Sequence, residues 1–241
     1  MQIVADLHTH TIASSHAYST VYEMARGAKN KSLLALGITD HGPNLPDAPH
    51  EWHFSNLDIL PRAIEGVTVI RGIEFNICPG GRLDDMHSKS LQPMEFALAS
   101  FHDSCFAPAT IAAHTEALEA VLHDPRVNAL GHPGNPKFEF DKEHIISQCS
   151  RFGKLVEINN HSFAGIRKGS RAHCAEIARL CMRYEVPVVV NSDAHIEYMV
   201  GRVDQALEML EEVGFPEELV VNSSKKRLDE YFRSRGLHLF A

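Results

Sequence analysis

The sequence predicts an α/β fold in which crossover helices connect the strands of a parallel sheet, either closed as a barrel or open and doubly wound. Three observations support this prediction. The chain has 241 residues, which suits one large α/β domain. Its 44% hydrophobic and 22% charged residues provide material for a full core. Short β-rich runs alternate with amphipathic segments as far as the C-terminal region. We therefore expect residues 1–241 to form a single domain.

Seven strands are expected, each a short run rich in β-branched and other apolar residues. They are separated by segments with helical periodicity, which is typical of a parallel sheet. In chain order the predicted strands are residues 3–6, 33–39, 67–74, 96–100, 127–131, 155–159 and 186–191.

Amphipathic helices are predicted between these strands. The first, at residues 20–31, opens with Thr20, and Glu23 follows three residues later, which is the pattern of a capping box. Asp141 is the expected N-cap of another helix. The other predicted helices are residues 110–122, 141–151 and 171–184.

Two loops are long for a compact domain. Residues 40–56 are rich in Pro, His and aromatic residues, and residues 76–93 are punctuated by Gly and Pro. Long loops in compact domains are usually functional, so we expect both to form walls of a site.

Charge and cysteine usage limit the possible partners. The formal net charge of −8 is the wrong sign for a protein that binds long nucleic acid, whereas a small anionic substrate remains compatible with it. The N-terminal residues 1–6 resemble a first strand, so secretion and membrane insertion are not expected. The five cysteines are scattered and form no C-x-x-C pair, which favours reduced thiols in a cytoplasm.

Metal-binding residue types follow six of the seven predicted strands. Side chains at positions i and i+2 of extended chain point the same way, so His8 and His10 can face one ion, as can Asp193 and His195. A lone histidine is more often structural, but that explanation gives no reason for such residues to gather at successive strand ends. The carboxyl ends of parallel strands lie on one face, so a divalent metal site is predicted there, with zinc, iron or manganese. The residues concerned are His8, His10, Asp40, His41, Glu74, His102, His132, Asp193 and His195.

With these motifs in order, the sequence resembles the PHP (polymerase and histidinol phosphatase) family, and most of all its YcdX-like branch of probable phosphatases. The resemblance covers nearly the whole chain. Its motifs are H-x-H at 8–10, then His16, T-D-H at 39–41, G-I-E at 72–74, F-H at 101–102, G-H-P-G-N-P at 131–136, E-I-N-N at 157–160 and S-D-A-H at 192–195.

The resemblance implies a distorted (β/α)7 TIM-like barrel with three metal ions, commonly zinc, at the C-terminal ends of the strands; manganese or iron would also suit these ligands. Glu74 would bridge the first and second ions. By motif, the first ion is held by His8, His10, Glu74 and Asp193, the second by Glu74, His102 and His132, and the third by His16, His41 and His195.

A metal-bound hydroxide would then attack the phosphorus of a substrate whose charge the ions neutralise. Arg167 and Lys168 follow the sixth strand and are expected to hold the phosphate, with an ordinary basic loop as the alternative. Asp6 and Asp40 either orient ligand imidazoles or serve turns. Glu157 either supports the site or pairs with a basic residue, and His161 is expected in a loop near the site.

The sequence thus predicts a cytoplasmic, metal-dependent phosphoesterase that acts on a small phosphorylated substrate, without long nucleic acid or membrane as partner. Histidinol phosphate is one candidate substrate. Two alternatives stay open: an exonuclease or phosphodiesterase on short nucleotides, and a non-catalytic metal-binding regulatory protein. An amidohydrolase is disfavoured because the strand ends lack a metal-bridging lysine.

Overall fold

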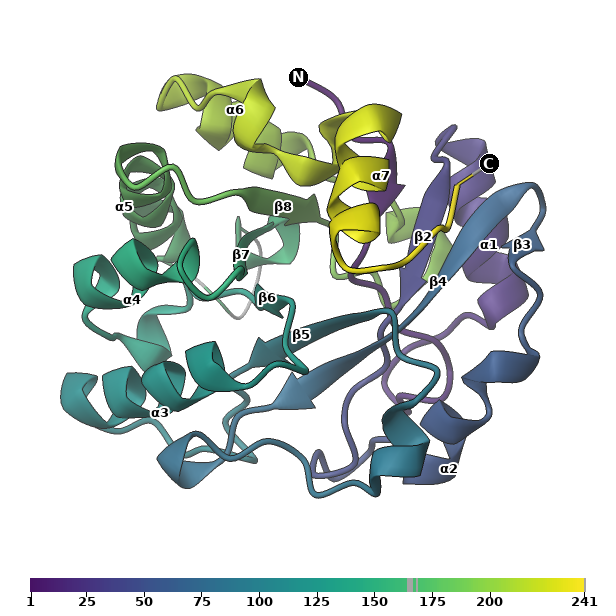
Figure 1. Ribbon diagram of the computed structural model, residues 1–241, viewed down its shortest axis with the longest axis horizontal. Helices are drawn as coiled ribbons and strands as arrows, with labels where there is room; N and C mark the ends of the chain where they lie inside the picture. The colour runs from purple at the N-terminus through teal and green to yellow at the C-terminus, as the bar shows by residue number, and fades with distance from the viewer. Residues whose placement is uncertain (164–166, 168, 241) are drawn as a thin grey trace.

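A nearly closed barrel of seven parallel strands organises the part of the chain that the computed structural model describes, residues 1–163, 167 and 169–240 (Figure 1). The predicted α/β class and barrel are therefore confirmed. A further short strand, β3 (Ala63–Ile64), pairs antiparallel with β4 and was not predicted. Around the barrel the order is β1 (Ala5–Asp6), β2 (Ala35–Ile38), β4 (Val67–Asn76), β5 (Phe96–Ser100), β6 (Ala129–Leu130), β7 (Leu155–Asn159) and β8 (Val188–Asn191).

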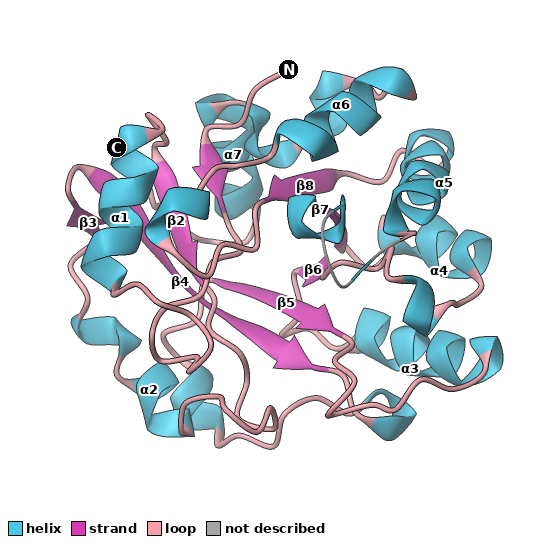
Figure 2. Cartoon of the chain, turned by 180° about the vertical axis from the view of Figure 1, so that it is seen from behind, coloured by secondary structure: helices cyan, strands magenta, loops and turns pink. Residues whose placement is uncertain are grey.

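The helices lie outside the strands, and α3, α4 and α5 follow one another around the outside of β5, β6 and β7 (Figures 1 and 2). No helix in the described residues is both long and apolar enough to span a bilayer. The short α2 lies within the predicted loop 40–56, and α6 and α7 extend the alternation to the C-terminal region. The bounds are α1 (Val21–Asn30), α2 (Glu51–Ser55), α3 (Ile111–His123), α4 (Lys142–Cys149), α5 (Ser170–Arg183), α6 (Asp204–Glu212) and α7 (Lys225–Ser234).

The predicted helix starts are confirmed in their hydrogen bonds. Glu23 donates its backbone N–H to Thr20 Oγ1 at 3.3 Å, and Thr20 donates its own N–H to Glu23 Oε2 at 2.7 Å, which completes the capping box of α1. Asp141 accepts the N–H of His144 at 3.0 Å and caps α4.

Apolar side chains fill the barrel interior and seal one end of it. The first residues of several strands, such as Ala35 of β2 and Phe96 of β5, pack against Leu228 and Phe232 of α7, all of them buried. Helix α7 therefore covers the N-terminal ends of the strands. Burial of this apolar surface stabilises the barrel and leaves only the carboxyl end open for polar chemistry.

The seam between β1 and β8 is bridged by a side chain instead of a continuous ladder. The fully buried Asn222 accepts the N–H of Val190 at 3.0 Å and donates its amide to the carbonyls of Ala5 at 2.7 Å and Val190 at 2.6 Å. Nearer the open end, Leu7 donates its N–H to Asn191 Oδ1 at 2.9 Å. Two asparagine side chains thus help to close the barrel, together with the backbone bond from the N–H of His10 to the carbonyl of Ala194 at 2.8 Å.

Replacing Asn222 by alanine should destabilise the protein, because three backbone groups at the seam would lose their buried partner. We expect the free energy of unfolding to fall by about 2–4 kcal/mol in urea denaturation. Asn44→Ala, at an exposed position, is the matched control and should change stability by no more than about 0.5 kcal/mol. Similar losses in the two variants would contradict the bridging role.

Candidate metal centre

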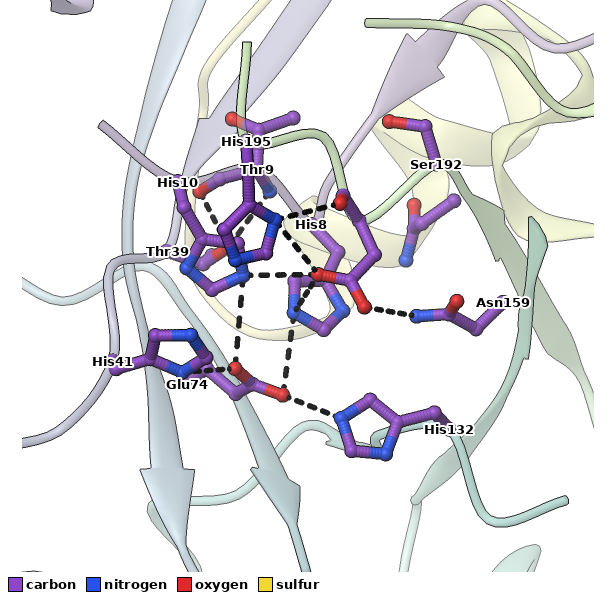
Figure 3. Close-up of polar contacts among 12 residues, drawn as sticks. His8, Thr9, His10, Thr39, His41, Glu74, His132, Asn159, Ser192 and His195 are labelled. Carbon is purple, nitrogen blue, oxygen red and sulfur yellow. Dashed lines mark hydrogen bonds and ion pairs between the residues drawn. The ribbon is translucent and has the colours of Figure 1, made fainter. Parts of the chain in front are cut away.

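All nine predicted metal ligands lie in one contiguous cluster at the carboxyl ends of the strands. Figure 3 labels His8, His10, His41, Glu74, His132 and His195 among them. Most are buried, whereas the His16 side chain is 46% exposed at the rim. They come from six strand ends and one loop: His8, His10 and His16 after β1, His41 after β2, Glu74 within β4, His102 after β5, His132 after β6, and Asp193 and His195 after β8.

The fully buried carboxylate of Glu74 lies at the middle of this cluster. Burial raises its pKa, but the surrounding imidazoles, with His8 foremost, outweigh that effect and hold the pKa well below its usual value. The Glu74 side chain is therefore ionised although it is fully buried. Among the described residues, the imidazole nitrogens within 3.6 Å of it belong to His41 at 2.7 Å, His132 at 2.9 Å, His8 at 3.3 Å, and His10 and His102 at 3.6 Å.

Asp193 forms a second acidic point of the cluster. Its Oδ1 lies 3.2 Å from His10 Nε2 and 3.6 Å from His8 Nε2, and these three residues can present their atoms to one ion. Asp193 has a φ of 58°, so the chain is not extended there, contrary to the assumption behind the prediction that Asp193 and His195 face one ion. His195 Nδ1 lies 3.7 Å from Asp193 Oδ1, and His195 Nε2 lies 3.0 Å from His16 Nε2.

Two further groups of ligand atoms converge. Atoms of His41, Glu74 and His102 form one group among the described residues, and atoms of His10, His41 and His195 form another. His16 joins the latter group, because its Nε2 also lies 3.3 Å from His41 Nε2.

Several buried atoms of the cluster have no hydrogen-bond partner in the described part of the chain. A buried polar atom without a partner costs about 1–3 kcal/mol, so a group of them needs an explanation. Imidazole nitrogens and carboxylate oxygens that face one another without hydrogen bonds match the ligand preferences of zinc, manganese or iron, and the residues present therefore fit divalent ions. The atoms are His8 Nε2, His10 Nδ1 and Nε2, His41 Nδ1, Glu74 Oε2, His102 Nε2 and Asp193 Oδ1.

Glu157 supports the cluster from behind. It accepts the proton of His8 Nδ1 at 2.7 Å and the backbone N–H of His132 at 2.7 Å. Burial raises the pKa of Glu157, but His8 outweighs burial and lowers it below its usual value. Because the carboxylate only accepts, His8 carries a proton on Nδ1, which leaves Nε2, directed toward Glu74 and Asp193, as the nitrogen that would bind a metal ion. Of the two alternatives for Glu157, the supporting role is the one that the structure shows.

Three asparagines that the sequence analysis missed also hold this end of the barrel. Asn76, Asn159 and Asn191 are the last residues of β4, β7 and β8. Asn76 binds His102 at 2.7 Å, Asn159 donates to Asp193 at 3.2 Å, and Asn191 donates to Glu157 at 2.9 Å. The recurrence of asparagine at the final position of a strand is the signal that could have identified them.

Asp6 and Asp40 hydrogen-bond to residues of loops. Of their two predicted roles, orienting ligand imidazoles or serving turns, these contacts agree with the second. Asp40 accepts the N–H of Thr11 at 2.7 Å and the hydroxyl of Ser14 at 2.9 Å. Asp6 accepts the N–H of Ser192 at 3.1 Å, one residue before Asp193. Their contribution to the cluster is therefore indirect.

A cavity of about 600 Å³ opens beside the cluster. Loop residues Leu45, Pro46 and Asp47 line it, as the loop 40–56 was expected to do, together with Ser104, His161 and Arg167. Residues 76–93 do not line this cavity, so that expectation is wrong. Arg167 Nη1 donates to Asp193 Oδ2 at 3.0 Å, whereas Lys168 lies outside the described residues.

Comparisons with known proteins agree with this geometry. The family model described as PHP domain matches residues 6–232. A curated protein of Acetivibrio thermocellus named a probable phosphatase is 46% identical over 235 residues, which are 98% of this chain and 97% of that protein. A probable phosphatase of Clostridium novyi is 39% identical over 98% of this chain and 97% of its own length.

The solved structures extend the similarity of the fold. The crystal structure of histidinol phosphate phosphatase from Lactococcus lactis, in complex with zinc, L-histidinol and phosphate, has a TM-score of 0.61 at 15% identity. The match covers 90% of this chain and 95% of that chain. At this identity the similarity is one of fold.

Glu157→Gln should weaken zinc binding, because the new amide N–H₂ would face either the His8 Nδ1 proton or the His132 N–H. We expect roughly 10–100-fold lower zinc affinity in competition titrations with a chelating dye. Glu143→Gln, whose side chain is 56% exposed on α4, is the control and should bind zinc as the unmodified protein does. Equal affinities in both variants would show that Glu157 does not orient His8.

Proposed function

The chain belongs to the PHP domain family, and on that premise we propose that it is a metal-dependent phosphatase that hydrolyses phosphate esters of small molecules. The observation that carries the proposal is the cluster of buried imidazole and carboxylate atoms that lack hydrogen-bond partners among the described residues, beside an open cavity. The names of the curated relatives, probable phosphatases, support the same reaction class. The sequence-based resemblance to this family is confirmed.

We assign three divalent zinc ions to the cluster, with manganese or iron as alternatives of suitable ligand chemistry. His8, His10, Glu74 and Asp193 would hold the first, Glu74, His102 and His132 the second, and His16, His41 and His195 the third. The three convergent groups of ligand atoms support this assignment, with His41 and His10 each lying close to more than one group. When bound, the ions would supply charge neutralisation for the phosphate and an activated water at neutral pH.

Arg167 is the group that we assign to the substrate phosphate. Its guanidinium lines the cavity, and one nitrogen is tied to Asp193, which fixes the direction of the side chain. A fixed guanidinium can bind two phosphate oxygens at once. Lys168 remains a prediction as a second phosphate ligand.

His161 is the residue that we assign to the leaving group. Ester cleavage places the electron pair of the P–O bond on the leaving oxygen, which then needs a proton. His161 lines the cavity and hydrogen-bonds to no described residue, and its ring centroid lies 6.4 Å from that of His195. It can therefore reach a substrate in the cavity and recover its proton from solvent.

The size of the cavity and the charge of the chain support a small substrate. Ligand pockets for small molecules span about 300–1,000 Å³, and this one has about 600 Å³. The net charge of −8 opposes the binding of long nucleic acid. The five cysteines are free thiols, which supports a reducing cytoplasm as the place of action.

Removal of the metal ions and removal of the Glu74 charge should each abolish or strongly reduce phosphate release. We expect chelator-treated protein to release no phosphate from p-nitrophenyl phosphate until zinc, manganese or iron is returned. Glu74→Gln should lower the rate at least about 100-fold and should not be rescued by added metal, because its neutral amide is a poor metal ligand. Full activity of either sample would contradict the proposed reaction, provided that thermal unfolding shows both to be folded.

Arg167→Ala should weaken phosphate binding without loss of metal. Loss of one charge-assisted contact, worth about 1.5–3 kcal/mol, predicts roughly tenfold or larger increases in KM and in the inhibition constant of inorganic phosphate. Arg171→Ala is the control, since Arg171 lies on α5 and pairs with Glu212. Unchanged constants for Arg167→Ala would refute its assignment.

His161→Gln should distinguish esters by their leaving groups. An alkyl phosphate leaves as a strongly basic alkoxide and needs the proton, so we expect kcat to fall about 100-fold. p-Nitrophenolate needs no proton, so its release should be nearly unchanged, and the metal content should not change. A loss of the same factor for both esters would rule out the proposed proton transfer.

A further inference from the structure

We propose that Asp84 and Asn76 act as positioning residues that keep the proton of His102 on Nδ1, so that its Nε2 faces Glu74 as a metal ligand. The inference rests on the proposed metal centre and adds a residue of the loop 76–93 to it. That loop does not line the cavity beside the cluster.

The contacts of His102 define its orientation. Its Nδ1 lies 2.7 Å from Asn76 Oδ1, in hydrogen-bond geometry. Its Nε2 is buried, lies 3.6 Å from Glu74 Oε1 and has no hydrogen-bond partner among the described residues. If the amide oxygen of Asn76 faces His102, then Nδ1 must donate and Nε2 must carry the lone pair.

The orientation of the Asn76 amide is set by two groups that can only accept. Asn76 Nδ2 lies 2.8 Å from the carbonyl of Gly42 and 2.9 Å from Asp84 Oδ1. Both contacts require N–H donors, so the nitrogen of the amide is on that side and the oxygen is on the side of His102. Asp84 therefore determines, through Asn76, which nitrogen of His102 carries the proton.

Asp84 is itself fixed in place. It is 2% exposed and accepts the backbone N–H of Asn76 at 2.6 Å and that of Asn44 at 2.7 Å. Gly42 allows this close approach, since a Cβ at that position would overlap the Asp84 carboxylate. Gly42 directly follows His41, so the same carboxylate packs against the backbone beside another proposed ligand.

Asp84→Asn is the informative change, because it keeps size and removes one acceptor. In either orientation the introduced N–H₂ faces an N–H donor. At the Oδ1 position it faces the Asn44 backbone N–H and Asn76 Nδ2, and at the Oδ2 position it faces the Asn76 backbone N–H. With the new N–H₂ at the Oδ1 position, only the Gly42 carbonyl still holds the Asn76 amide in place, so a reversed amide, which turns its N–H₂ toward His102 Nδ1, becomes populated. His102 then accepts on Nδ1 and carries its proton on Nε2, where it can no longer bind a metal.

The test measures both the proton position and the metal. In zinc-loaded protein with ¹⁵N-labelled histidine, long-range ¹H–¹⁵N spectra, assigned with His102→Gln, should show His102 protonated on Nδ1. Asp84→Asn should shift the proton to Nε2 and weaken the affinity of one zinc site about 10–100-fold. Asp85→Asn removes the same charge from the next, exposed position and should leave both readouts unchanged.

The outcomes distinguish failure of the metal centre from failure of the relay, by which we mean the hydrogen bonds from Asp84 through Asn76 to His102. Unmodified protein that binds no zinc contradicts the proposed function and the relay with it. Protein that binds zinc, but whose Asp84→Asn variant keeps full zinc affinity and the Nδ1 proton, contradicts the relay alone. If Asp84→Asn fails to fold, the spectrum of the unmodified protein decides, since a proton on His102 Nε2 overturns the inference.

Discussion

The burial of the Glu74 carboxylate among imidazoles is the interaction on which the rest of the site depends. A charge removed from water is costly unless partners compensate for it, and the surrounding imidazoles, with His8 foremost, supply part of that compensation. Burial of apolar side chains in the rest of the barrel interior, which α7 seals at the opposite end, offsets this cost. Divalent ions would complete the compensation, since they bind the same nitrogen and oxygen atoms that lack hydrogen-bond partners in the described residues.

A continuous set of hydrogen bonds joins the barrel seam to this cluster. Asn222 links β8 to β1, and Asn191, at the end of β8, binds both the backbone of Leu7 and the carboxylate of Glu157. Glu157 in turn fixes the ring of His8. Asn191 therefore takes part both in closing the barrel and in orienting a proposed ligand.

Local sequence patterns predicted the alternation of strands and helices and the residues at the strand ends, because periodicity and the parallel topology decide both. They could not predict which strand-end residues share an ion, since that depends on backbone turns such as the positive φ of Asp193. Nor could they predict the partner of Asp6, which is Ser192, 186 residues away. The role proposed for Asp84 depends on hydrogen bonds to Asn76 and Asn44, which form only when the loop 76–93 folds back against the end of β4.

Anomalous diffraction from crystals of the zinc-loaded protein tests most directly whether the nine clustered side chains hold divalent ions. We expect about three peaks at the zinc absorption edge, each roughly 2.0–2.2 Å from imidazole nitrogens or carboxylate oxygens of the cluster. Glu74 should contact two of them. Crystals soaked in zinc that show no peak in the cluster, or peaks only at surface histidines such as His144, would contradict the proposed metal centre.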